Sequence, residues 1–141
     1  MTQARTILIL ADDDPDDRLL TREAFEEAGF AGTFQFVDDG QQLLDYLDTS
    51  RESLPGVILL DLNMPRMNGY EALSELKTDA ALRRIPIIVL TTSNSSEDIL
   101  RSYDLGVNSF ITKPGSFGEL KEVAKRVIDY WLGTVKLPPQ D

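Results

Sequence analysis

The sequence predicts an α/β fold in which one parallel sheet of five strands carries helices on both faces, a doubly wound arrangement. Short β-branched runs alternate five times with longer segments of helical period, which is the pattern of strands joined by crossover helices. Three of these runs are almost wholly apolar, as expected for strands that are covered on both faces. The 141 residues, 42% of them hydrophobic, are enough for one packed domain.

Five segments have the composition of strands, and consecutive segments are separated by enough residues to form a helix. We expect strands over residues 6–11, 34–37, 57–60, 86–91 and 109–112.

Helix boundaries are marked by capping residues. Pro15 follows Asp14, which is the order of an N-cap and a first helical residue, and three further starts pair a capping residue with an acid three positions later. The four expected N-caps are Asp14, Asn68, Ser95 and Ser116. Gly29 and Gly106 are expected to end helices.

The last helix shows its buried face clearly. Six apolar residues recur at helical spacing and should cover the sheet; they are Leu120, Val123, Ala124, Val127, Ile128 and Trp131. A (βα)₅ chain of this size is most often a flavodoxin-like sandwich with strand order 2-1-3-4-5, whose ligand crevice lies at the carboxyl ends of the first and third strands.

Composition excludes several classes of function. The chain has no cysteine or histidine, so disulfides, thiol nucleophiles and imidazole-based triads are excluded. The formal charge of −10 and the lack of a basic patch argue against direct nucleic-acid binding. No apolar run approaches the ~20 residues of a membrane span, and no signal peptide is recognisable, so we expect a cytoplasmic protein without membrane contact.

Polar side chains follow four of the expected strands at the same edge of the sheet. Asp12 and Asp13 follow the first strand, Asp61 the third, Thr91 ends the fourth and Lys113 follows the fifth. The acidic loop after the first strand would repel a bare phosphate, whereas neighbouring carboxylates suit Mg²⁺ (or Mn²⁺). With a metal present, Asp61 is a candidate nucleophile for a phosphoryl group, Lys113 a counter-charge and Thr91 a hydrogen-bond donor.

Four ordered motifs, ILILADDDPDD, ILLDLNMPRMNG, IPIIVLTTS and FITKP, resemble the receiver domain of two-component response regulators over about residues 5–130. The resemblance implies that Asp61 accepts a phosphoryl group from a histidine kinase. It also implies that Asp12 and Asp13 form the acidic pair, with Asp13 a direct metal ligand, and that the Asn63 carbonyl is a further ligand.

The same resemblance implies a conformational switch. Thr91 corresponds to the switch hydroxyl and Phe110 to the switch aromatic residue, while Lys113 corresponds to the family's lysine. The Lys113–Pro114 peptide is expected to be cis, a geometry that proline allows at low cost.

The C-terminal YWLGTVKLPP is similar to the ends of single-domain regulators that partner bacterial and cyanobacterial phytochrome histidine kinases. Members of that group commonly form homodimers. We therefore expect a receiver domain over residues 1–132, a C-terminal extension over 133–141 and no output domain. The expected dimer or partner face comprises Tyr130, Trp131, Val135 and Leu137.

Two other functions remain open at this stage. A phosphate-independent interaction module would keep the fold without the switch, although none of the acids, the threonine or the lysine is missing. A phosphatase of the haloacid dehalogenase type also forms an aspartyl phosphate, but it needs an acid two residues after the nucleophile, where this chain has Asn63. We therefore expect a phospho-accepting signalling domain and not an enzyme with turnover.

Overall fold

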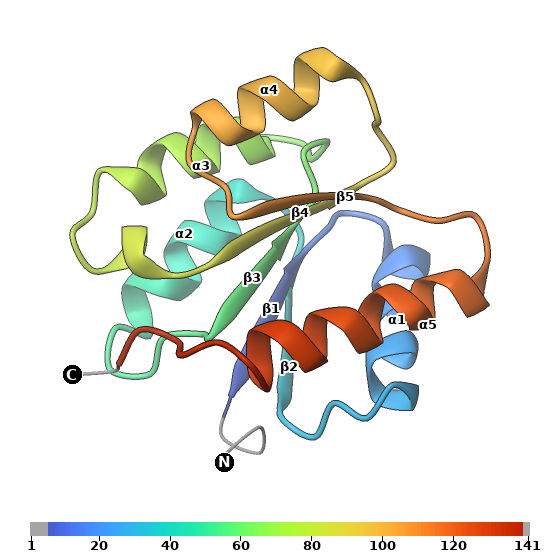
Figure 1. The fold of residues 1–141 in the computed structure, drawn as a ribbon. Helices are drawn as coiled ribbons and strands as arrows, with labels where there is room; N and C mark the ends of the chain where they lie inside the picture. The colour runs from blue at the N-terminus through green and yellow to red at the C-terminus, as the bar shows by residue number, and fades with distance from the viewer. Residues whose placement is uncertain (1–5, 140–141) are drawn as a thin grey trace.

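The computed structural model describes residues 6–139 and contains the five parallel strands expected, in the order β2-β1-β3-β4-β5 (Figure 1). Each expected strand agrees with the observed one to within one residue. The strands are β1 (Ile7–Ala11), β2 (Thr33–Val37), β3 (Val57–Leu60), β4 (Ile87–Thr91) and β5 (Ser109–Thr112). Pro86 lies just outside β4, yet its carbonyl accepts a hydrogen bond from the Ile58 amide at 3.0 Å.

The helices follow the strands in the expected alternation. They are α1 (Pro15–Glu27), α2 (Gly40–Thr49), α3 (Gly69–Lys77), α4 (Ser96–Asp104) and α5 (Phe117–Val127), with a short 3₁₀ helix η2 (Leu82–Arg84) before β4. All four expected N-cap side chains accept backbone hydrogen bonds from the first turn of their helices. Gly29 and Gly106 follow α1 and α4 with φ of 104° and 96°, a conformation that glycine adopts without steric cost.

The sheet separates two apolar cores. Leu43 and Leu47 of α2 and Leu73 of α3 pack on one face, whereas Phe25 of α1 and Ala124 of α5 pack on the other. Figure 1 shows α1 and α5 side by side on one face, with α2 and α3 on the opposite one. β1, β3 and β4 are covered on both faces, which accounts for their continuous apolar sequences.

The last helix departs from regular α-helical period at its end. The expected stripe is buried or half-buried as far as Ile128, where the chain enters a π-helical turn, η3 (Ile128–Leu132). The wider turn changes the direction of the side chains, and Trp131 is only half-buried. The Thr134 and Val135 amides then donate to the Tyr130 carbonyl, at 3.1 and 2.9 Å.

One backbone expectation is wrong. The Lys113–Pro114 peptide is trans, and no peptide bond within residues 6–139 is cis. Trans is the isomer that a bond before proline intrinsically favours.

Gly69, the first residue of α3, is required by a close approach of two backbone segments. A Cβ there would lie 2.7 Å from the Asp61 carbonyl oxygen and 2.8 Å from the Leu62 Cα, and neither atom can move without shifting the chain. We expect Gly69→Ala to lower the free energy of unfolding by about 2 kcal/mol, as overpacking does. Urea denaturation measures this change.

Gly118 provides the matched control, because it also lies in the first turn of a helix but has nothing within 4 Å of a built Cβ. Gly118→Ala should be neutral or stabilise by about 0.5 kcal/mol. Equal effects of the two substitutions would contradict the steric explanation.

Candidate functional site

The expected site residues meet at the carboxyl ends of the strands. Asp12 and Asp61 follow β1 and β3, which are paired in register up to Ala11 and Leu60, and the Asp61 amide donates to the Ala11 carbonyl at 3.0 Å. Because the strands are parallel, both aspartates emerge at one edge of the sheet. Both are buried.

Asp61 is held by groups from three different segments. Its Oδ1 accepts hydrogen bonds from the Thr91 hydroxyl at 3.0 Å and from the Asn63 amide at 3.2 Å. Its Oδ2 lies 3.5 Å from the Lys113 ammonium. The Thr91 hydroxyl, which the switch hypothesis expects to move toward Asp61, therefore already contacts this carboxylate in the present structure.

Lys113 is the cation of the site. Its Nζ donates to Asp12 at 2.7 Å and to Asp17 at 3.2 Å, and its side chain is only 11% exposed. Burial alone would lower the pKa of Lys113, but the hydrogen bond to Asp12 and the charges of Asp61, Asp12 and Asp17 raise it above its usual value. Lys113 is therefore charged at neutral pH.

Asp12 experiences the opposite balance. Burial raises the pKa of Asp12 above its ordinary value of 3.8, and the hydrogen bonds from Lys113 and from the Asp14 amide only partly offset this rise. The nearby charge of Asp61 raises it further. The carboxylate of Asp12 thus depends on Lys113 to remain ionised.

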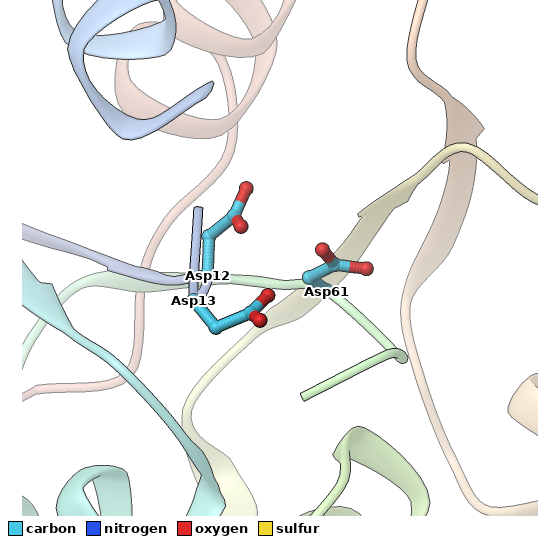
Figure 2. Close-up of side chains that lie close together, drawn as sticks. All are labelled: Asp12, Asp13 and Asp61. Carbon is cyan, nitrogen blue, oxygen red and sulfur yellow. The ribbon is translucent and has the colours of Figure 1, made fainter. Parts of the chain in front are cut away.

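Asp12, Asp13 and Asp61 each offer a carboxylate oxygen, and these oxygens lie within 4.8 Å of one another (Figure 2). Asp13 is exposed, whereas the other two are buried. Three carboxylates at this spacing are a donor set for a hard divalent cation such as Mg²⁺, which leaves other coordination positions to water. The residues present therefore fit such an ion.

A second polar network connects the end of β4 to α3 and α4, and we did not anticipate it from the sequence. Asp98 accepts hydrogen bonds from the Ser93 hydroxyl, at 2.5 Å, and from the Tyr70 hydroxyl. The Arg101 guanidinium lies 3.9 Å from the centroid of the Tyr70 ring. Burial and the hydrogen bond to Asp98 raise the pKa of Tyr70 to about 12.

One buried hydroxyl lies beside this network. Ser102 of α4 is fully buried near Tyr70, but its Oγ makes no hydrogen bond of normal geometry with any residue from 6 to 139. In the sequence, Asp98 has the spacing of a capping acid after Ser95, and nothing local indicates that it also binds Ser93 and Tyr70.

The expected switch aromatic residue lies on β5, and two residues of the expected dimer face follow α5. Phe110 on β5 is half-buried and packs against the core that contains α2 and α3. Tyr130 is 54% exposed, and its ring meets that of Trp131 edge-on at 5.4 Å between centroids. Both rings line a shallow apolar hollow with Ile111 of β5.

The rest of the expected dimer face is more dispersed. Leu137 lies against Gly56 near the start of β3, where a Cβ on the glycine would be 3.0 Å from the leucine Cδ1. Val135 is half-buried. The structure therefore brings Tyr130 and Trp131 together. It places Leu137 near the amino-terminal end of β3, whereas the carboxylates lie at the carboxyl ends of the strands.

Lys113→Met should destabilise the metal-free protein, because it leaves the buried Asp12 carboxylate without a positively charged partner. We expect a loss of about 3 kcal/mol at pH 8, measured by urea denaturation with a chelator present. Without Lys113 the folded-state pKa of Asp12 rises further above 3.8. A raised carboxyl pKa stabilises the folded state at low pH, so the deficit should shrink as the pH falls from 8 to 5.

Lys121→Met is the control, since Lys121 pairs with Glu27 at 3.7 Å between exposed side chains. Its effect should stay within about 0.5 kcal/mol at both pH values. A deficit in Lys113→Met that does not change with pH would contradict the assignment to Asp12.

Within residues 6–139, no helix is long and apolar enough to cross a bilayer. The chain does, however, match known proteins along most of its length. The sequence model of the family described as the response regulator receiver domain matches residues 8–125 of this chain. The probable methanogenesis regulatory protein FilR2 of Methanothrix harundinacea is 42% identical over 135 residues, which cover 94% of this chain and 87% of FilR2.

Two cyanobacterial proteins are similar in both sequence and structure. Response regulator Rcp1 of Synechocystis is 34% identical over 136 residues, covering 94% of this chain and 92% of Rcp1. Its Mn²⁺-bound crystal structure has a TM-score of 0.84, with 95% of this chain and 99% of that one covered. The phosphorylated cyanobacterial phytochrome response regulator RcpA has a TM-score of 0.88 at 38% identity, with the same coverage. The strand order, the polar strand ends and these matches together establish that the chain belongs to the receiver domain family of response regulators.

Proposed function

We propose that this receiver domain accepts a phosphoryl group on Asp61 from a histidine kinase and responds by changing a surface that binds a partner. The observation that carries the proposal is the position of the Asp61 carboxylate, between the Thr91 hydroxyl and the Lys113 ammonium and beside two further carboxylates. A nucleophilic oxygen, a hydrogen-bond donor and a fixed cation are thereby gathered within a few ångströms.

A divalent cation completes the proposed chemistry. Receiver domains bind Mg²⁺ or Mn²⁺ at an acidic cluster, and the Rcp1 structure is of a Mn²⁺-bound form. Here Asp12, Asp13 and Asp61, with the backbone carbonyl of Asn63, would hold the ion. When bound, it supplies positive charge that offsets the negative charge of the phosphoryl oxygens.

The side chains have distinct parts in the transfer. An oxygen of Asp61 forms the new bond to phosphorus as the phosphorus–nitrogen bond of the kinase's phosphohistidine breaks. Lys113 faces the developing negative charge, and the Thr91 hydroxyl moves from the carboxylate to a phosphoryl oxygen. Asn63 cannot act as an acid or base, which argues against turnover of small phosphomonoesters in the manner of a haloacid dehalogenase phosphatase.

The proposed switch reaches the surface through the loop after β4. Ser93 is two residues from Thr91 and binds Asp98 at 2.5 Å, so movement of Thr91 pulls on the first turn of α4. The outer face of α4 carries Leu100 and Tyr103, which are 64% and 48% exposed. Phe110, half-buried on neighbouring β5, is the proposed aromatic partner of the movement.

The partners are proposed on separate grounds. RcpA is described as a phytochrome response regulator, and we propose a phytochrome-linked histidine kinase for this chain too. FilR2 is 42% identical to this chain, but its name refers to methanogenesis and not to a phytochrome. The proposal of a phytochrome-linked kinase therefore rests on the RcpA likeness and on the C-terminal segment. The cytoplasmic location and the division into residues 1–132 and 133–141 stay predictions.

We also propose a homodimer whose interface includes the two aromatic rings of η3, the exposed Tyr130 and the half-buried Trp131. Tyr130 and Trp131 form an aromatic pair on an apolar hollow of the β5–α5 surface. Aromatic residues are enriched at protein interfaces, and an apolar hollow at the surface is a candidate contact site.

Incubation with Mg²⁺ and acetyl phosphate tests the central proposal. Intact mass should show one added phosphoryl group in the wild type, none in Asp61→Asn and none after chelation of Mg²⁺. Asp14→Asn is the matched control, because Asp14 is an exposed N-cap that asparagine replaces well, and it should be labelled normally. No labelling of folded, metal-bound wild type would favour the phosphate-independent interaction module.

Amide hydrogen exchange on the same samples tests the switch. Phosphorylation should change exchange in the β4–α4 loop and α4, while α2 on the other side of β3 stays constant. Thr91→Ala should be labelled without this change. A labelled wild type with unchanged exchange would contradict the proposed route through Ser93.

Tyr130→Ser should weaken the proposed dimer at least about tenfold, measured by sedimentation velocity over a range of concentrations. Tyr130 is 54% exposed, so its loss should not affect folding. Leu19→Ser, on α1, removes an equally exposed apolar side chain that does not line the hollow at Tyr130, and it should leave association unchanged. A wild type that stays monomeric, or equal effects of both substitutions, would refute the proposed interface.

A further inference from the structure

The segment that links β3 to α3 and includes the first residue of α3, residues 62–69 (the 62–69 loop), has an unusual backbone for its sequence. Arg66 has φ of 60°, and no other residue from 6 to 139 except glycine has a positive φ. This left-handed conformation is unfavourable for a side chain with a Cβ, and glycine would adopt it freely. A strained residue of this kind persists only where surrounding contacts hold it.

The contact that holds Arg66 is an ion pair with a buried carboxylate 27 residues away. Nε and Nη2 of Arg66 both donate to Oδ2 of Asp39, the first at 2.8 Å. Asp39 is 1% exposed and is the N-cap of α2, where its Oδ1 accepts from the Gln42 amide at 2.9 Å. Each oxygen of Asp39 therefore has its own partner.

The loop is also anchored through its backbone. The Gly40 amide donates to the Met67 carbonyl at 2.8 Å, and the Gly69 amide donates to the Leu62 carbonyl at 3.0 Å, which closes the loop at its base. A Cβ on Gly40 would lie 2.6 Å from the Met67 oxygen, so α2 and the loop are in direct contact.

This anchored loop contains Asn63. The Asn63 amide donates to Asp61 Oδ1 at 3.2 Å, so the backbone at this position lies beside the acidic cluster. The loop is therefore held by three contacts: between Leu62 and Gly69, between Arg66 and Asp39, and between the Asn63 amide and Asp61. The carbonyl of Asn63 belongs to this fixed segment.

We propose that the Arg66–Asp39 ion pair is a positioning device that holds the 62–69 loop in the conformation needed for cation binding, and so sets the affinity of the acidic cluster for Mg²⁺ or Mn²⁺. The inference rests on the metal site of the proposed function and adds to it two residues that are not ligands. Supporting groups outside the ligand shell commonly change metal affinity by about 10- to 100-fold.

Electrostatics and positioning predict opposite results for Arg66. Removal of a positive charge from the protein would, by charge alone, strengthen the binding of a cation to the acidic cluster. Loss of the anchor would weaken it. The sign of the change in Arg66→Gly therefore separates the two explanations, and glycine also avoids the steric penalty at φ of 60°.

The experiment is a titration of the full chain with Mn²⁺, without phosphodonor. The concentration of free Mn²⁺ is measured by electron paramagnetic resonance at each step. We expect Arg66→Gly and Asp39→Asn each to raise the dissociation constant about tenfold. Asparagine keeps the N-cap of α2, so Asp39→Asn removes the charge and not the helix start. Because the two side chains act as a pair, the double variant should bind about as weakly as either single variant.

Arg51→Gly is the matched control. Arg51 also forms a two-partner ion pair, with Asp48 and Asp79, but it lines a hollow near the start of β3, at the other end of the sheet. It should change the dissociation constant less than twofold. Urea denaturation of every variant checks that the comparison is made between folded proteins.

Each outcome has a separate meaning. Arg66→Gly that binds Mn²⁺ as tightly as the wild type, or more tightly, overturns the positioning role and leaves phosphoryl acceptance untouched. Wild type that binds no Mn²⁺ at millimolar concentration overturns both the inference and the metal part of the proposed function. A third outcome is that Arg66→Gly binds Mn²⁺ more weakly than the wild type, while the wild type binds Mn²⁺ but accepts no phosphoryl group. This result supports the inference and refutes the proposed phosphoryl acceptance.

Discussion

The ammonium group of Lys113 allows several carboxylates to gather at the edge of the sheet. Asp12 is fully buried and Asp61 nearly so, and like charges at this separation would oppose folding. Lys113 reaches them from the end of β5, the edge strand, and bonds Asp12 across the whole width of β3 and β4. The ion pair between Lys113 and Asp12 therefore links the end of β5 to the end of β1, two strands that are not neighbours in the sheet.

The local features of the fold could be predicted because each depends on residues close together in the chain. Apolar runs located all five strands, and a capping side chain before an acid located three helix starts. Helix α2 had no predicted start, since Asp38-Asp39-Gly40 resembles a turn as much as an N-cap. The π-helical turn also had no signal, because Ile128 and Trp131 continue the apolar spacing of α5.

The candidate site was predictable for a topological reason. Residues directly after parallel strands converge at one edge, so Asp12, Asp61, Thr91 and Lys113 could be grouped before any contact was known. The supporting contacts could not be found in this way. Arg66 with Asp39, and Ser93 with Asp98 and Tyr70, depend on how loops pack against neighbouring helices, and each side chain has an ordinary local interpretation.

Trp131 has an experimental consequence that follows from its place in the fold. It is the only tryptophan in the chain, and it lies in the π-helical turn beside Tyr130, on the β5–α5 surface and away from the carboxylates at the strand ends. Half-buried indole emission changes when its surroundings become drier. Intrinsic fluorescence should therefore act as a built-in optical probe of events at this surface, whereas cation binding at the acidic cluster needs a spectroscopic label of its own.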